Sequence, residues 1–211
     1  MMVLQDRAKA TRESIIAGAS DVFAEYGYGN ASLTQVADTA GVTKGALYFH
    51  FRSKEELARA VIAEQHRISL ADSEAVFAEE RSPVETMILM CRSFGLRLVH
   101  EPIVKAGIRL TFEATTFGPP MRGPYEDWIA AMEHLVQRGK DEGQIRQAVD
   151  PAALSRYIVA SFTGVQMVSE VLTSRADVMQ RIEQMWAILL PGIVSEELRP
   201  DAATLAGLVS A

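Results

Sequence analysis

The stretch from Ser32 to Leu57 constrains the fold of this chain more than any other part of it. It reads SLTQVADTAGVTKGALYFHFRSKEEL. Its first residue, Ser32, is a favoured helix N-cap, and Gln35 three residues later completes a capping box. Apolar residues then recur at helical spacing, namely Leu33, Val36, Ala37 and Ala40. Gly41 tolerates the positive φ that commonly ends a helix. The pattern therefore predicts a short amphipathic helix that ends in a tight turn.

Two further helix starts follow this turn. Thr43 is the predicted N-cap of a short helix over residues 44–50, and Ser53 with Glu56 forms a second capping box ahead of a long helix. Two short helices joined by a turn that contains glycine form a helix-turn-helix unit, whose second helix fits the major groove of DNA. A solvated helical hairpin in an ordinary bundle has the same periodicity, so the spacing alone leaves both interpretations open.

The small and polar residues of this unit are the candidate DNA contacts. The N-terminal end of the second helix, which would lie nearest the bases, carries Thr43, Lys44 and Gly45. Because Gly45 has no side chain, the helix backbone could approach a phosphate or a base edge closely. Lys54 stands at the start of the third helix, where a phosphate could meet both its ammonium group and the helix N-terminus. The complete set of predicted DNA-binding residues is Thr34, Thr43, Lys44, Gly45, Tyr48, His50 and Lys54.

The charge distribution is compatible with such a surface. The chain has a net charge of −6, but residues 1–67 contain eight basic and eight acidic residues, so the excess of acid lies beyond them. Phosphate contacts need local positive charge rather than a basic protein. The basic residues that could share one face are Arg7, Lys9, Arg12, Lys44, Arg52 and Lys54. Those of the first helix are equally well explained as solvated surface.

The string GVTKGALYFHFRSKEEL is far more specific than its periodicity. Together with the preceding SLTQVA, it resembles the DNA-binding domain of the TetR repressor family, over about residues 12–62. The resemblance implies an all-α homodimer. It also implies an N-terminal three-helix DNA-binding domain, here residues 1–67. A larger C-terminal domain, residues 68–211, would bind a small effector and dimerise.

Composition and cysteine content narrow the class of protein further. Hydrophobic residues make up 48% of the 211 residues, which is enough for a sizeable core. The one cysteine, Cys91, excludes an internal disulfide, and its apolar surroundings over residues 87–91 favour a buried structural thiol. No signal peptide is expected at the charged N-terminus, and the apolar run over residues 186–190 is far shorter than the ~20 residues that span a bilayer. We therefore expect a cytoplasmic protein without membrane contacts.

The sequence offers little to an enzyme. His100 is followed by Glu101 and Pro102, which is not the helical HExxH arrangement, and no histidine pair has the spacing of a zinc site. There is no GxSxG motif and no glycine-rich phosphate loop. We expect no catalytic residues, no metal and no cofactor.

Helical periodicity continues through the rest of the chain. The predicted helices cover residues 6–26, 54–80, 83–99, 102–112, 125–142, 151–174 and 176–190, with a weaker helix over 200–209. One clear loop, rich in glycine and proline, covers residues 117–124. The apolar residues of 151–174 and 176–194 cover more than one helix face, which predicts a dimer interface unless both faces are covered within one subunit.

A ligand pocket is expected in the C-terminal half. Trp128 lies shortly after the glycine and proline loop, with Tyr125 nearby, and an arbitrary tryptophan in that place would more often be a core residue. Single polar residues interrupt otherwise apolar helix faces, at Gln65, Thr111, Thr163 and Gln166. Such residues either satisfy one another or face a cavity, and ligand pockets are apolar with a few placed polar groups.

Over nearly its whole length the sequence looks most like the γ-butyrolactone receptor branch of the TetR family in actinomycetes. The strings that carry this resemblance are VKAGIRL at 104–110, RGPYEDW at 122–128, FTGVQMVSE at 162–170 and MWAILLPGI at 185–193. The resemblance implies that Trp128 lies in the hormone pocket and that Thr163 and Gln65 hydrogen-bond to a lactone or a related ring. The predicted ligand-binding residues are Trp128, Thr163, Gln65, Gln166 and Thr111.

These observations predict a repressor that binds a palindromic operator in double-stranded DNA as a homodimer. A small hydrophobic, oxygenated effector of the γ-butyrolactone, butenolide or furan type would release it and so control secondary metabolism. The alternative is a pseudo-receptor, or another TetR-family regulator, that responds to an antibiotic or a different hydrophobic molecule.

Overall fold

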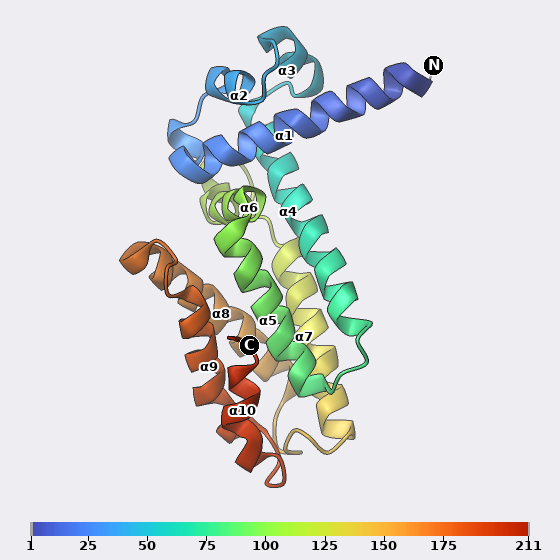
Figure 1. The fold of residues 1–211 in the computed structure, drawn as a ribbon, viewed down its shortest axis with the longest axis vertical. Helices are drawn as coiled ribbons and strands as arrows, with labels where there is room; N and C mark the ends of the chain where they lie inside the picture. The colour runs from blue at the N-terminus through green and yellow to red at the C-terminus, as the bar shows by residue number, and fades with distance from the viewer. Residues whose placement is uncertain (1, 211) are drawn as a thin grey trace. The chain divides into compact units, whose positions relative to one another are not determined.

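The computed structural model describes residues 2–210, with side chains from residue 6 onward, and its regular elements are helices (Figure 1). They are α1 (Met2–Asn30), α2 (Leu33–Thr39), α3 (Lys44–His50), α4 (Lys54–Phe77), α5 (Pro83–His100), α6 (Pro102–Glu113), α7 (Gly123–Asp141), α8 (Pro151–Thr173), α9 (Val178–Ile193) and α10 (Ala202–Gly207), with short 3-10 helices η1 (Ala114–Thr116) and η2 (Arg199–Asp201). The predicted all-α fold is confirmed.

These elements form two compact units. The first holds the described residues up to Ser69 together with His100–Met121, and the second holds Leu70–Val99 and the described residues from Arg122 onward. Helix α4 therefore contributes residues to both units. The boundary predicted between residues 67 and 68 stays a prediction, because the first unit also takes in α6, which the sequence assigns to the C-terminal domain.

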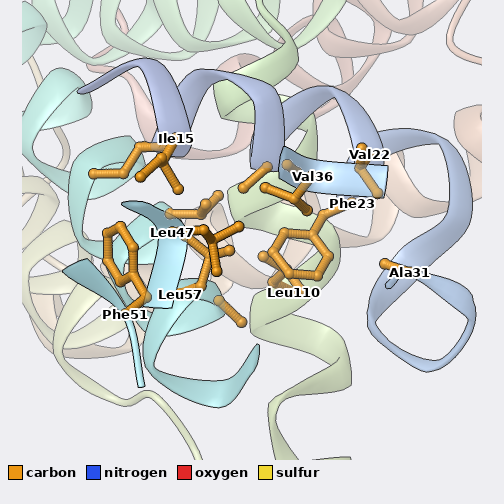
Figure 2. Packing of buried hydrophobic residues seen from close by; sticks show 14 of the residues in the cluster. Ile15, Val22, Phe23, Ala31, Val36, Leu47, Phe51, Leu57 and Leu110 are labelled. Atoms are coloured by element: carbon orange, nitrogen blue, oxygen red, sulfur yellow. The ribbon is translucent and has the colours of Figure 1, made fainter. Parts of the chain in front are cut away.

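The first unit is organised around one apolar core, shown in Figure 2. Helices α1, α2, α3, α4 and α6 all contribute to it, and the large members include Ile15, Phe23, Val36, Leu47, Phe51, Leu57 and Leu110, none more than 1% exposed. Burying each such side chain contributes about 1.5–3 kcal/mol. Leu110 places α6 in this core, which is the physical reason that α6 belongs to the first unit.

The helix starts predicted from the sequence are present. Oγ of Ser32 accepts from the backbone N–H of Gln35, and Oε1 of Gln35 accepts from the backbone N–H of Ser32, so the capping box of α2 is complete. Gly41 has the expected positive φ of 65°. At the start of α4, Oγ of Ser53 accepts from the N–H of Glu56 as predicted, at 3.0 Å. The Glu56 carboxylate accepts from the N–H of Arg52, one residue earlier than a complete capping box requires.

The C-terminal end of α1 departs from the prediction, which ended the helix at residue 26. The chain kinks at Gly27, with φ 71°, and helical structure continues to Asn30. Two cations from other helices satisfy carbonyls at this end. The Arg109 guanidinium donates to the carbonyls of Ala24 and Glu25, and the Lys54 ammonium donates to those of Tyr28 and Ala31 at 2.7 and 2.9 Å. Positive charge at a helix C-terminus also interacts favourably with the helix dipole.

The second unit is a bundle of α5, α7, α8, α9 and α10 with the end of α4. Helix α8 packs between α7 and α9, and α10 packs on α9. Gly95 of α5 lets α9 approach closely, because a Cβ there would lie 2.7 Å from Cδ1 of Ile182. Arg97 of α5 forms an ion pair with Asp72 of α4, and Trp186 of α9 is fully buried.

Cys91 lies in the interior of this bundle. Its side chain is 2% exposed, and burial raises the pKa of its thiol to about 12, with the indole of Trp186 partly opposing that shift. A thiol with that pKa is almost entirely protonated near neutral pH, and the thiolate is the reactive form. The predicted structural role of Cys91 is therefore favoured over a reactive one.

The helices of residues 2–210 include none that is both long enough and apolar enough to cross a lipid bilayer.

The close approach of α1 to the end of α2 gives a test of the packing. A Cβ at Gly18 would lie 2.8 Å from the backbone nitrogen of Ala40 and 2.9 Å from its Cβ, so a Gly18→Ala substitution must push α2 away. We expect it to lower the free energy of unfolding by about 1–3 kcal/mol, the usual effect of overpacking. The matched control is Gly29→Ala, whose Cβ would meet no atom within 4 Å. Urea denaturation followed by circular dichroism measures both, and equal stability of the two variants would contradict the packing described here.

Candidate DNA-binding surface and effector site

Helix α3 is held to the first unit by one side chain of its own. Leu47 is the buried residue of α3, and Phe51 directly after the helix is buried with it. The N-terminus of α3 is capped by Thr43, whose Oγ1 accepts from the N–H of Ala46 at 3.1 Å. This attachment leaves the other sides of a seven-residue helix open to solvent.

The structure brings most of the predicted DNA contacts to this open surface. Lys44, Gly45 and Tyr48 are exposed on α3, and Thr34 is exposed in the first turn of the neighbouring α2. His50 is half-buried at the end of α3. The ring of Phe49, which is absent from the predicted set, is 81% exposed and meets the ring of His50 edge-on with a centroid distance of 5.1 Å.

Lys54 differs from the other predicted contacts because its ammonium group is occupied. It donates to the carbonyls of Tyr28 and Ala31, with a longer contact of 3.4 Å to that of Gly29, and it lies 4.4 Å from the centroid of the Tyr28 ring. Both a helix cap and a cation–π contact favour this position. The structure therefore gives Lys54 a role in ending α1, which a phosphate contact would have to displace.

Of the basic residues Arg12 and Lys9 of α1, only Arg12 lies beside the end of α3. The guanidinium of Arg12 stands over the ring of Phe51 at 5.2 Å from its centroid, beside the end of α3, and its side chain is exposed. Lys9 instead pairs with Glu13 at 3.9 Å on an exposed part of α1, a type of pair that contributes little to stability. Of these two, Arg12 is the better placed to meet a phosphate bound along α3.

The predicted ligand-binding residues fall into both compact units. Gln65 and Thr111 belong to the first unit, where Gln65 is buried and donates from Nε2 to Oγ of Ser69 at 2.7 Å. A Cβ at Gly107 would lie 2.4 Å from Cβ of Gln65, so this glutamine packs directly on α6. Thr111 donates to the carbonyl of Gly107 at 2.7 Å. Both residues therefore have partners inside their own unit.

In the second unit, Trp128 belongs to a cluster of three aromatic rings. The rings of Phe94 and Trp128 meet edge to face with a centroid distance of 5.3 Å, and those of Phe94 and Phe162 do so at 5.6 Å. Trp128 is only partly buried, unlike the fully buried Trp186. The sequence alone did not assign Phe94 and Phe162 to this cluster, because their positions on apolar helix faces look the same as those of core residues.

Polar groups of α7 and α8 lie next to these rings in the chain. The Tyr125 hydroxyl hydrogen-bonds with Thr163, and burial raises the pKa of Tyr125 while that hydrogen bond lowers it in part. Gln166 lies one turn after Phe162 on α8, and its buried Oε1 has no hydrogen-bond partner among the described residues. A buried acceptor without a partner is costly, so Gln166 is suited to accept a hydrogen bond from a bound molecule.

Replacing Lys44 or Lys54 by methionine should have different effects on stability and on DNA binding. Lys54→Met removes hydrogen bonds from a charged donor, so we expect it to lower the free energy of unfolding by about 1.5–3 kcal/mol. Lys44→Met removes an exposed charge, so we expect stability to stay the same while the dependence of duplex DNA binding on log[salt] falls by about one unit of slope. Thermal unfolding and salt titrations of DNA affinity measure these effects. A stable Lys54→Met protein with a reduced salt slope would assign Lys54 to phosphate binding after all.

Comparisons with known proteins agree with this geometry. Residues 15–61 match the family of bacterial regulatory proteins called the tetR family, and residues 81–195 match the tetracyclin repressor-like C-terminal domain. The A-factor receptor protein of Streptomyces griseus is 39% identical over 192 residues, which are 91% of this chain and 67% of that protein.

Two solved structures are similar over almost the whole chain. A γ-butyrolactone receptor described as ArpA-like has a TM-score of 0.82 and 30% identity, with 97% of this chain and 98% of that chain covered. CprB from Streptomyces coelicolor, solved in complex with its biological operator sequence, has a TM-score of 0.84 and 30% identity, with 96% and 98% covered. The two family matches and the 39% identity together make this chain a member of the TetR family, which consists of DNA-binding transcriptional regulators and not of enzymes.

Proposed function

We propose that this protein is a ligand-responsive repressor that binds a palindromic operator as a homodimer. A small hydrophobic, oxygenated signalling molecule of the γ-butyrolactone, butenolide or furan type would release it and so control secondary metabolism. The observation that carries the proposal is the aromatic cluster of Phe94, Trp128 and Phe162, with hydrogen-bonding groups on the same helices. The similarity to the A-factor receptor and to the ArpA-like receptor supports the choice of effector class.

The chemistry of the aromatic cluster suits a small amphipathic ring. Edge-to-face aromatic rings present an apolar wall, and Trp128 retains an exposed portion against which a ligand could pack. Gln166 could accept from a hydroxyl group of the ligand. Of the hydrogen-bonded Tyr125 and Thr163 hydroxyls, the one whose O–H is not used between them could donate to a ring or carbonyl oxygen. A molecule with an apolar chain and a few oxygen atoms satisfies both requirements. Gln65 and Thr111, which have partners in the first unit, remain proposed contacts on the resemblance alone.

Release from DNA then follows from linkage between two binding events. If the effector binds better to a conformation in which the two reading helices of the dimer are wrongly spaced, DNA affinity falls by the same factor as effector affinity falls on DNA. A coupling free energy of about 3 kcal/mol already gives a change of more than a hundredfold. No bond has to be made or broken.

The dimer is proposed through α8 and α9, which carry an unpartnered apolar surface. The exposed apolar residues of this surface are Tyr157, Met167, Val168, Val171, Leu172 and Ile188. Val171 and Ile188 are 82% and 80% exposed, which is costly for apolar side chains in water. Ala160 and Gly164 lie on the same exposed side of α8 and would let a partner helix approach closely. Contiguous surfaces of this kind mark interaction sites, and a second copy supplies the matching face by two-fold symmetry.

Part of the interface predicted from the sequence is core instead. Ile158, Phe162, Val178, Ile182 and Met185 are buried within the second unit itself. They stabilise the subunit, and only the outward-facing residues of α8 and α9 remain for the dimer. The alternative, that both faces are covered within one subunit, does not hold for the exposed outward side, and the proposed dimer uses that side alone.

Replacing Trp128 tests the effector site. We expect Trp128→Ala to bind operator DNA like the wild type but to resist release by synthetic γ-butyrolactones, butenolides and furans in a mobility-shift assay. Trp128→Phe, which keeps an aromatic ring, is the matched control and should retain partial release.

Because the chain has two tryptophans, Trp186→Phe leaves Trp128 as a single fluorophore, and its emission reports effector binding without DNA. Release by an antibiotic and by none of the three compound classes would favour the alternative of a pseudo-receptor, and loss of DNA binding in Trp128→Ala would make this tryptophan structural.

The dimer interface is tested by a charge on the exposed face of α8. Val171→Asp places an unpaired carboxylate against the partner helix, so we expect a monomer in sedimentation velocity at micromolar concentration and a loss of operator affinity. Ala203→Asp adds the same charge to an exposed position on α10 and should leave the dimer intact. A wild-type monomer, or a Val171→Asp dimer, would exclude this interface.

A further inference from the structure

Helix α3 carries an aromatic ring that its contacts within the described residues do not bury. Phe49 is 81% exposed, and its ring meets the ring of His50 edge-on. Water around a phenyl ring is unfavourable, and burying the ring against another molecule would recover that free energy. The position of Phe49 on the open side of α3 indicates what that molecule is.

Phe49 lies opposite the residue that anchors the helix. Residues 45 and 49 are each two positions from Leu47. At 3.6 residues per turn, each therefore lies about 160° from Leu47 around the helix axis, and both are close to the side directly opposite it. Leu47 is fully buried and faces the core of the first unit. Gly45 and Phe49 are therefore neighbours, one turn apart, on the face of α3 that points away from the protein.

Gly45 indicates that another molecule approaches this face closely. A Cβ at this position would meet one heavy atom within 4 Å, Oγ1 of Thr43 at 3.8 Å, and the backbone there does not have a positive φ. Neither packing nor backbone geometry within the described chain requires glycine, which weakens a helix relative to alanine. The missing side chain leaves room for a surface that lies against the backbone of α3.

The chemistry of the major groove then identifies the partner of the ring. Among the base-pair edges in that groove, the 5-methyl group of thymine is the apolar one, and phenylalanine is among the side chains that contact it. We infer that Phe49 is a specificity-determining residue whose ring packs on the 5-methyl group of one thymine in each operator half-site, while Gly45 lets the preceding turn approach the base edges. This inference rests on the operator binding proposed above and adds one base to what the operator must contain.

The competing arrangement places the ring on a deoxyribose of the backbone. That contact would contribute to affinity for every sequence and carry no information about the bases. The two arrangements differ in one methyl group, and replacing thymine by uracil removes only that group from the duplex.

The test uses the full-length wild-type protein and a duplex that it selects from a random library at moderate salt. Each thymine is replaced in turn by deoxyuridine, symmetrically in both half-sites, and the affinity is measured by fluorescence anisotropy. We expect one position at which uracil weakens binding about fourfold per half-site, or about 15-fold for the pair, as burial of one methyl group implies. At the same position, a 5-methylcytosine·guanine pair should bind better than a cytosine·guanine pair by a similar factor.

Phe49→Ala links that position to the side chain. This variant should bind the thymine and uracil duplexes equally at the sensitive position while keeping any uracil effects elsewhere, and Phe49→Leu should retain part of the preference. Because Phe49 is exposed, both variants should unfold at the wild-type temperature. A flat uracil scan with the wild type, or a Phe49→Ala protein that is weaker on all duplexes but keeps the same thymine preference, would overturn this inference alone. Failure of the wild type to select any duplex would overturn operator binding as well.

Discussion

The burial of Leu47 decides which side of α3 is open to solvent. A helix of seven residues is too short to be stable alone, so it exists here because Thr43 caps its first turn and Leu47 joins a core built from four other helices. The same anchor turns Lys44, Gly45, Tyr48 and Phe49 outward. The burial of Leu47 thus helps α3 to form, together with the Thr43 cap, and it decides which residues α3 presents to solvent.

The C-terminal end of α1 connects this core to a part of the chain distant in sequence. Arg109 of α6 and Lys54 of α4 bring positive charge to carbonyls at this end of the helix and directly after it. Glu113 adds a carboxylate that accepts from the N–H of Tyr28 at 2.6 Å, and Phe117 stacks on the Tyr28 ring at 4.1 Å. The residues 100–121 are therefore part of the body that holds the helix-turn-helix unit. A movement of α6 would be felt by α1 directly.

The sequence was informative wherever local rules decide the outcome. Helix caps at Ser32 and Thr43, the positive φ at Gly41 and the buried position of Cys91 follow from the chemistry of neighbouring residues. The motif around α3 was specific enough to identify the family. A short helix that must pack on a protein core on one side and fit a DNA groove on the other tolerates few sequences. Lys44, Gly45 and Tyr48, which the sequence proposed as DNA contacts, are exposed on this helix.

The sequence was less informative wherever a residue has two possible environments. Lys54 looks like a phosphate ligand from its place at the start of a helix, yet its ammonium group ends another helix 23 to 26 residues earlier in the chain. Some of the apolar residues of α8 and α9, among them Ile158, Phe162 and Ile182, are core rather than candidates for a dimer interface. Periodicity says that a helix has two apolar sides, and it does not say which side meets the rest of the same subunit.

By itself, then, the sequence determined the all-helical class, the helix-turn-helix unit and the family, because these depend on local propensity, capping and a specific motif. Only the tertiary structure decided that α6 joins the first unit, that Phe94 meets both Trp128 and Phe162, and that Phe49 points outward beside Gly45. Those facts depend on contacts between residues far apart in the chain, and no local pattern encodes which distant side chain fills the space next to a given residue.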